Sequence, residues 1–185
     1  MASWNAPRSR GYVPHCDNAG LIQHLVFRLT DSLPPATIGT LETTPITQRL
    51  EAAEVALDRG LGASSLSDPR VAALVRDALL YFDGQRYGLF AWCVMPNHVH
   101  VLAAQVEGWP LASVIHSWKS LTANRANIVL ARQGRFWARE YFDRAMRNEK
   151  QVEQTHLYIE ANPVTAGLCA SPGDWPWSSA SYRAI

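Results

Sequence analysis

Residues 86–102 read RYGLFAWCVMPNHVHVL, and this stretch decides the fold of the region around it. Two apolar runs, 86–94 and 98–104, flank the turn-forming pair Pro96-Asn97, which predicts a β-hairpin. Side chains two apart in a strand share a face, so His98 and His100 lie side by side on the returning strand. Such a pair offers two ligands to a divalent cation. Two histidines on the polar side of a half-buried strand give the same spacing, and the spacing alone favours that second interpretation.

Strands and helices alternate on both sides of this hairpin. Helical spacing of apolar residues, capping residues and Pro or Gly breakers set their limits. In chain order we predict a strand at 21–29, a loop at 33–45, helices at 47–59 and 69–82, a helix from 111 that ends before Gly134, a strand within 136–146 and a helix at 148–161. This order predicts an α+β fold of ferredoxin-like type, with an antiparallel-rich sheet and helices packed on one face.

The length and composition fit one globular domain. The chain has 185 residues, of which 48% are apolar and 18% charged, so it is expected to fold as a single domain over 1–185. Residues 1–20 are expected to be a flexible N-terminal segment, and 33–84 a loop and helical elaboration. No run of about 18 apolar residues predicts a membrane span, and the N-terminus lacks the apolar core of a signal peptide, which favours the cytoplasm. The three cysteines are far apart, which predicts neither disulfides nor a thiolate metal site.

Positive charge is concentrated downstream of the hairpin. The net charge is only +1, but residues 117–150 hold eight basic and three acidic side chains. Aromatic residues such as Trp118 and Phe136 interleave with them, a pattern typical of single-stranded nucleic-acid binding, where bases stack on rings and cations follow phosphates. Aromatic residues at these spacings also suit a core, and a solvated surface is the alternative for the cations.

The helix predicted at 148–161 carries a second candidate group. Tyr158 and Asn162 are four residues apart, so they lie on one helical face. Together they could supply a nucleophile and a neutral oxygen ligand to one centre. The spacing alone favours a plainer interpretation, with Asn162 as a cap before Pro163 and Tyr158 as a core residue.

Several motifs together resemble the REP-associated tyrosine transposases, which are IS200-like single-tyrosine HUH transposases. The matching stretches are FAWCVMPNHVHVL at 90–102, Lys119 within HSWKSLTANRAN, FWARE-YFDRAMRNEKQ at 136–151, LYIEANPVTAGL from Leu157 and DWPWSS ending at Ser179. The resemblance covers the chain from about Leu21 onward. It implies the ferredoxin-like fold of the HUH endonuclease type.

The resemblance also implies roles for individual residues. Tyr158 would be the catalytic tyrosine, and His98, His100 and Asn162 would hold a divalent cation, Mg²⁺ or Mn²⁺. The enzyme would cleave single-stranded DNA, form a 5′-phosphotyrosine intermediate and transfer the strand, acting on hairpin DNA of the repetitive extragenic palindrome (REP) kind. In the cell it would be cytoplasmic, and nucleoid-associated when bound to DNA.

The remaining predictions concern the DNA and the assembly. The candidate DNA-binding residues are Lys119, Arg125, Arg135, Arg144, Arg147, Arg8 and Arg10. Two alternatives stay open: a domesticated nickase of hairpin DNA, and a non-catalytic DNA-binding module. The resemblance is compatible with a monomer or a homodimer, and no membrane partner is expected.

Overall fold

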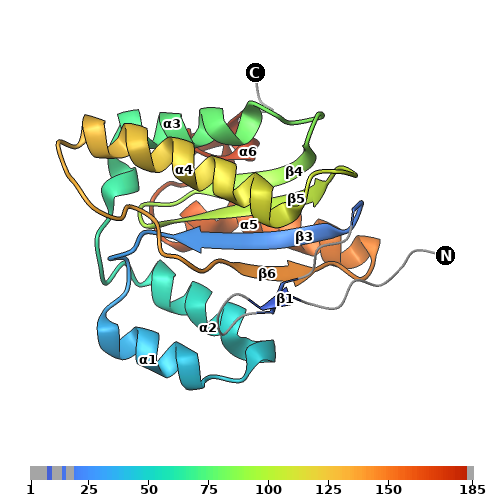
Figure 1. Cartoon of the computed structure of the whole chain (residues 1–185), viewed down its shortest axis with the longest axis horizontal. Helices are drawn as coiled ribbons and strands as arrows, with labels where there is room; N and C mark the ends of the chain where they lie inside the picture. Colours follow the sequence, from blue (N-terminus) through green and yellow to red (C-terminus); the bar gives the residue numbers. More distant parts are fainter. Residues whose placement is uncertain (1–7, 10–13, 16–18, 183–185) are drawn as a thin grey trace.

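A four-stranded antiparallel sheet organises the chain (Figure 1). The structure, a computed structural model, describes residues 8–9, 14–15 and 19–182. The sheet has the order β4-β5-β3-β6, so strands that are neighbours in the sequence form only one of its three pairings. This order is that of the ferredoxin-like split βαβ unit, and the predicted α+β class is confirmed. The strands are β3 (Ile22–Arg28), β4 (Tyr87–Val94), β5 (His98–Gln105) and β6 (Phe142–Ala145).

Helices lie in two of the connections between these strands and after the last strand. The main ones are α1 (Pro35–Thr43), α2 (Ile46–Asp58), α3 (Pro69–Leu80), α4 (Leu111–Val129) and α5 (Glu149–Thr165). The short elements are β1 (Arg8–Ser9), β2 (Pro14–His15), the 3-10 turns η1 (Ser65–Ser67) and η2 (Pro172–Asp174), and α6 (Ser179–Tyr182). Among the described helices, none is long and apolar enough to cross a membrane.

Helices cover both faces of the sheet. On one face, Leu25, Phe27 and Val101 pack in a core with α3 and α4, as the sequence predicted. On the other face, Leu102 packs with Ile159 of α5, and Val26 packs with the α1–α2 pair. The expectation of helices on one face therefore misses α5 and α2. The reason is visible in β3 and β5, where residues pointing to both faces are buried and each face needs a cover.

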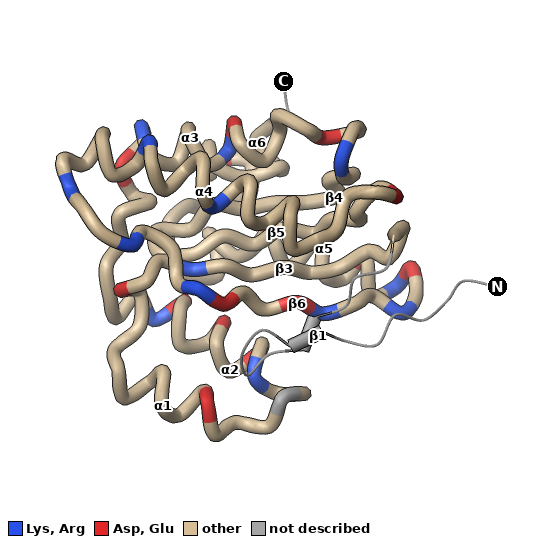
Figure 2. Tube along the Cα trace, in the orientation of Figure 1, with Lys and Arg blue, Asp and Glu red and all other residues tan. Residues whose placement is uncertain are grey.

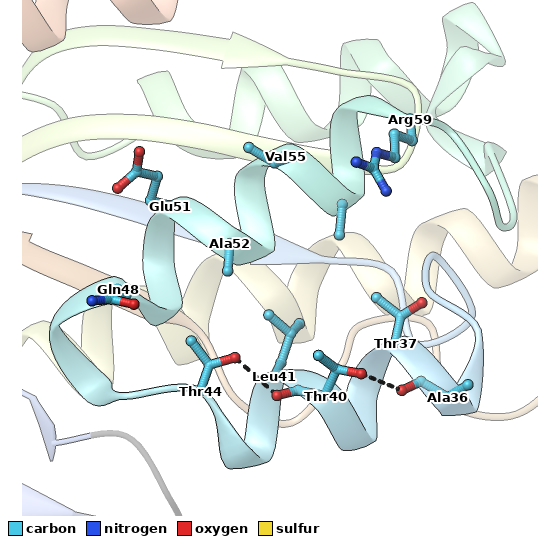
Figure 3. Close-up of a pocket in the computed structure, with 11 residues that line it drawn as sticks. Ala36, Thr37, Thr40, Leu41, Thr44, Gln48, Glu51, Ala52, Val55 and Arg59 are labelled. Carbon is cyan, nitrogen blue, oxygen red and sulfur yellow. Dashed lines mark hydrogen bonds between the residues drawn. The ribbon is translucent and has the colours of Figure 1, made fainter.

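The segment expected to be a loop at 33–45 forms helix α1 instead. Its threonines and prolines, which favour loops in isolation, are accommodated in helical geometry. Pro35 occupies the first helical turn, where its missing N–H is harmless, and the Thr40 hydroxyl donates to the carbonyl of Ala36 at 3.1 Å. Buried Leu41 anchors α1 against α2, and an open groove lies between the two helices (Figure 3).

Helix α5 runs past the predicted end at residue 161. It begins at the Asn148 cap, whose side chain accepts from the Gln151 amide at 2.9 Å, and it ends at Thr165. Pro163 lies inside the helix, where it lacks the N–H that would donate to the carbonyl of Ile159. Asn162 is therefore a buried helical residue rather than a cap, which places its side chain toward the sheet.

Candidate active site

The two histidines of the hairpin sit at the start of β5, in the interior of the protein. The turn closes through the Met95 amide, which donates to the carbonyl of His98 at 2.9 Å. In the register of the sheet His98 pairs with Arg28 and His100 with Val26, so both imidazoles share the face of β3 that carries His24. The three histidines are at most 1% exposed. They form a buried cluster rather than the polar edge of a strand.

Asn97 sets the protonation pattern of His98. Its amide nitrogen donates to the carbonyl of Leu57 at 2.9 Å, which fixes the orientation of the amide because a carbonyl only accepts. The amide oxygen then lies 2.6 Å from Nδ1 of His98, so this nitrogen must carry the hydrogen. The lone pair of His98 is left on Nε2, which faces Nε2 of His100 at 2.8 Å. The turn thus prepares His98 as a ligand.

Both ring nitrogens of His100 have close partners. Nε2 faces His98 and also lies 3.2 Å from the amide nitrogen of Asn162, while Nδ1 lies 3.1 Å from Nε2 of His24. A neutral imidazole has one N–H and one lone pair, so only one side of His100 can bind a cation. If Nδ1–H donates to His24, two lone pairs meet at 2.8 Å between His98 and His100. A shared proton or a cation relieves that repulsion.

Two carboxylates of helix α2 point at the same cluster. An oxygen of Glu54 lies 3.6 Å from Nδ1 of His100 and 3.5 Å from Nε2 of His24. An oxygen of Asp58, one helical turn later, lies 3.7 Å from Nε2 of His98. Asp58, His98 and His100 form one group of potential metal ligands, and His24, Glu54 and His100 form another. The segment between β3 and α3 therefore reaches the histidines.

Burial controls the charge of these groups. It holds the pKa of His24 and His98 well below the ordinary range and lowers the pKa of His100 to about 3. The three imidazoles are therefore neutral at neutral pH, the form in which they bind metals. Burial also raises the pKa of Glu54 to about 7 and raises the pKa of Asp58.

Tyr158 lies at the mouth of this cluster. Its ring meets the ring of His100 edge-on, with the centroids 5.8 Å apart, and the ring of His24 at 6.1 Å. The side chain is 39% exposed, so solvent and a ligand can reach it. Partial burial, followed by the charges of Glu54 and Asp58, raises the pKa of the phenol above its ordinary value. Tyr158 is therefore protonated at neutral pH.

The donor atoms fit a divalent cation. His98 and His100 offer imidazole nitrogens at a spacing close to the ~3 Å expected between neighbouring ligands that lie ~2.1 Å from a six-coordinate ion. The Asn162 side-chain oxygen is buried without a hydrogen-bond partner, and so is a Glu54 oxygen. Buried orphan oxygens of this kind are rare, and a cation beside His98 and His100 would satisfy that of Asn162. The residues expected to hold a metal are thus brought together, with Tyr158 beside them.

The predicted DNA-binding residues are spread more widely, as Figure 2 shows for the Lys and Arg positions. Arg144 pairs with His24 across β3 and β6, and its charge acts on Glu54 and Tyr158, so it lies near the site. Lys119 and Arg125 are on α4, which packs on the opposite face of the sheet.

The environments of these cations differ. The Lys119 ammonium donates to the carbonyls of Ala138 and Arg139 at 2.6 and 3.0 Å, a tie to the loop before β6. Arg125, Arg135 and Arg147 are exposed. Arg8 lies in β1, and Arg10 lies outside the described residues.

Sequence reasoning did not identify four residues of the cluster. His24 and Asn97 sit on predicted elements, but their relation to the histidine pair depends on strand register and on the packing of α2. Glu54 and Asp58 have the four-residue spacing of one helical face, which is common on surface helices. The alternation in the strand at 21–29 was the available signal for His24. It places His24 on the same face as Val26, the residue that pairs with His100 in the sheet.

Comparison with known proteins points to one family. A family profile described as "Transposase IS200 like" matches residues 78–162, from the last turn of α3 to Asn162. A REP-associated tyrosine transposase of Escherichia coli (strain K12) is 26% identical over 107 residues, which cover 57% of this chain and 62% of that protein. A provisionally named relative of the same description from Haemophilus influenzae is 25% identical over 99 residues, 48% of this chain and 56% of the relative. The matches thus span little more than half of each relative.

A solved structure shares the fold. It is described as a REP-associated tyrosine transposase bound to a REP hairpin, and it superposes with a TM-score of 0.62 at 19% identity, over 96% of this chain and 84% of the other. The resemblance found in the sequence motifs is therefore confirmed by the profile and the relatives, and the solved structure shows the same fold.

Proposed function

Because this chain is a relative of the IS200-like transposases, we propose that it cleaves single-stranded DNA and joins the cut strand through a tyrosine. The observation that carries the proposal is the meeting of two elements that are distant in the sequence. The hairpin strand β5 supplies His98 and His100, and helix α5 supplies Asn162 and, one turn earlier, the half-exposed Tyr158. A nucleophile beside a neutral histidine pair is the arrangement that such chemistry needs.

His98, His100 and Asn162 would hold the divalent cation, Mg²⁺ or Mn²⁺. Asn97 keeps the lone pair of His98 on the side facing His100, and the orphan oxygen of Asn162 is available as a third donor. A bound divalent cation supplies positive charge that polarises the scissile phosphate and offsets the charge gathering on its oxygens.

Tyr158 would act as the nucleophile. The phenol oxygen forms a bond to the 5′ phosphorus, the bond from phosphorus to the 3′ oxygen breaks, and that oxygen leaves with a proton as a 3′ hydroxyl. The phenolic proton leaves to water, which reaches this half-exposed side chain. Since burial raises the pKa of Tyr158, ionisation has to accompany attack rather than precede it. The phosphotyrosine keeps the bond energy for rejoining.

Hairpin DNA of the REP kind is the proposed substrate. The fold neighbour was solved with a REP hairpin, and the E. coli relative is described as REP-associated. Arg144 is the best-placed cation for a DNA strand entering the site, because it lies across from His24 and its charge acts on Tyr158. The exposed Arg125, Arg135 and Arg147 are candidate contacts with more distant phosphates, and Lys119 contributes if its carbonyl contacts are exchanged for DNA.

The test is formation of a covalent adduct. The protein is incubated with Mn²⁺ and a labelled pool of single-stranded hairpins with randomised flanks, then run on a denaturing gel. The proposal expects a labelled protein band that disappears in Tyr158→Phe and in the His98→Ala/His100→Ala double variant. Tyr81→Phe, which removes the same hydroxyl from a 70% exposed tyrosine, is the matched control and should keep the band.

The same experiment separates the alternatives. A band that survives in Tyr158→Phe shows that Tyr158 is not the nucleophile. DNA binding without a band in the unaltered protein supports the non-catalytic module. A band without transfer of the attached strand to a second DNA end supports the hairpin nickase.

A further inference from the structure

Helix α2 brings negative charge to a site whose expected ligands are all neutral. Two imidazoles and one amide, from His98, His100 and Asn162, carry no formal charge. Hard cations such as Mg²⁺ and Mn²⁺ prefer oxygen ligands, carboxylates above all. Glu54 and Asp58 are carboxylates that contact this cluster, and they lie outside the segment that matches the family profile, residues 78–162.

Asp58 stands on the side of the cluster where the lone pairs converge. Its oxygen lies 3.7 Å from Nε2 of His98, the nitrogen that the Asn97 contact leaves unprotonated. The ligand atoms of Asp58, His98 and His100 all lie within 4.8 Å of one another. The Asp58 side chain is 31% exposed, so it approaches from the solvent side and can adjust to a cation without disturbing the core.

Glu54 stands on the opposite side of His100. Its oxygen lies 3.6 Å from Nδ1, whereas Nε2 faces His98. A cation on Nε2 leaves the hydrogen on Nδ1, where Glu54 and His24 are the available acceptors. A carboxylate behind a metal-binding histidine fixes its tautomer and orientation, and its loss lowers metal affinity by ~10- to 100-fold. The two carboxylates of α2 therefore suit different roles.

Contacts at the C-terminal end of α2 and just after it hold the helix in place. The carbonyl of Leu57, next to Asp58, accepts from Asn97 in the turn that positions His98. After the helix, the amide of Ala63 donates to the carbonyl of Asp31 at 2.9 Å, and Gly62 packs so closely on Asp31 and Ser32 that a side chain there would collide with their backbone. The carboxylates are thus fixed relative to the histidines by backbone contacts.

We propose that Asp58 is a ligand of the cation held by His98 and His100, and that Glu54 is a positioning residue behind His100. This inference rests on the proposed function for the presence of that cation. It makes the α1–α2 segment part of the active site, so that the chain carries its own anionic ligand on an element inserted between β3 and α3.

Mn²⁺ binding to the full chain, without DNA, tests the inference. Affinity is measured by calorimetry, and the number of waters bound to Mn²⁺ by electron paramagnetic resonance in ¹⁷O-water. Asp58→Asn should weaken binding by at least ~10-fold and change the number of bound waters, whereas Glu54→Gln should weaken it by a similar factor with the water count unchanged. Glu51→Gln removes the same charge from an exposed position of α2 and should bind as the unaltered chain does.

Three results would overturn the assignment. The first is an Asp58→Asn variant with the affinity and water count of the unaltered protein. The second is a change in the number of Mn²⁺-bound waters in Glu54→Gln but not in Asp58→Asn. That result would make Glu54 the ligand and place the cation at Nδ1 of His100, beside His24. The third is an unaltered chain that does not bind Mn²⁺.

Folding of each variant is checked by circular dichroism. A second measurement uses the unaltered chain and so does not depend on the folding of any variant. With carboxyl-¹³C aspartate, a directly bound Asp58 gives a first-sphere ¹³C coupling to Mn²⁺, and its absence refutes the ligand role. The adduct assay is read separately. Mn²⁺ binding that depends on Asp58, without an adduct, removes the nuclease proposal and keeps this one, while the reverse pattern keeps the nuclease and removes Asp58.

Discussion

Acidification of the metal-free protein tests the neutral state of the buried histidines. Burial lowers the pKa of His100 to about 3, against 6.5 for an unhindered histidine. As the pH falls below 6.5, the unfolded chain takes up a proton on this residue that the folded chain refuses. The stability that depends on a neutral His100 is therefore full above pH 6.5 and is lost as the pH falls toward 3.

The size of the effect follows from those two values. Between pH 7 and pH 5, proton uptake by the unfolded state lowers the free energy of unfolding by about 2 kcal/mol for His100 alone. His24 and His98 act in the same direction. Glu54 acts in the opposite direction, because its pKa is raised from 4.5 to about 7 and the folded state takes up its proton first. A comparison of the unaltered protein with a His100 variant isolates the contribution of His100 to the pH dependence of the free energy of unfolding.

The assay is urea unfolding followed by tryptophan fluorescence at pH 7, 6 and 5, with a chelator present. Between pH 7 and pH 5, the free energy of unfolding should fall by about 2 kcal/mol more in the unaltered protein than in His100→Asn. This holds whatever the difference in stability between the two proteins at pH 7. His116→Asn, at an exposed position of α4, is the control and should follow the unaltered protein. An equal loss in His100→Asn and the unaltered protein would refute a neutral, buried His100.

Four further substitutions probe the scaffold of the protein. Gly62→Ala should lower the melting temperature, because a Cβ there collides with the backbone of the β3–α1 connection. Gly39 lies inside α1 with open space around it, so Gly39→Ala should raise the free energy of unfolding in urea by about 0.5–1 kcal/mol. Tyr87→Phe should destabilise by about 1–3 kcal/mol in the same assay, because the buried Trp118 indole N–H, 2.9 Å from the Tyr87 hydroxyl, loses its acceptor. Asn97→Ala should weaken Mn²⁺ binding about 10-fold by calorimetry, since the Nδ1 hydrogen of His98 is no longer held.

The central hairpin was predictable from local sequence. Alternating apolar runs and the Pro96-Asn97 turn specify two adjacent strands, so the placement of His98 and His100 on one face required no tertiary information. The same holds for α3, whose Asp68 cap accepts a hydrogen bond from the backbone N–H of Arg70 and whose apolar stripe is regular. Where turn chemistry and periodicity agreed, the elements formed within a few residues of the expected limits.

Prediction failed where distant packing decides the outcome. The threonine-rich segment of α1 has weak helical preference, and burial of Leu41 against α2 overrides it. Asn162 looked like a cap because Pro163 follows, yet packing of α5 on the sheet carries the helix onward to Thr165. Glu54 and Asp58 gave no local signal, because their role depends on His98 and His100, which lie forty or more residues further along the chain.

The sequence separations within the histidine cluster also determine when the site can exist. His24 and His100 are 76 residues apart, and His100 and Asn162 are 62 apart, so the cluster closes large loops whose entropy must be overcome by the whole core. During synthesis the cluster is incomplete until helix α5, which carries Asn162, has left the ribosome and docked on the sheet. An emerging chain therefore lacks the complete cluster, and the proposed DNA cleavage could begin only after synthesis had passed Asn162 and the fold had closed.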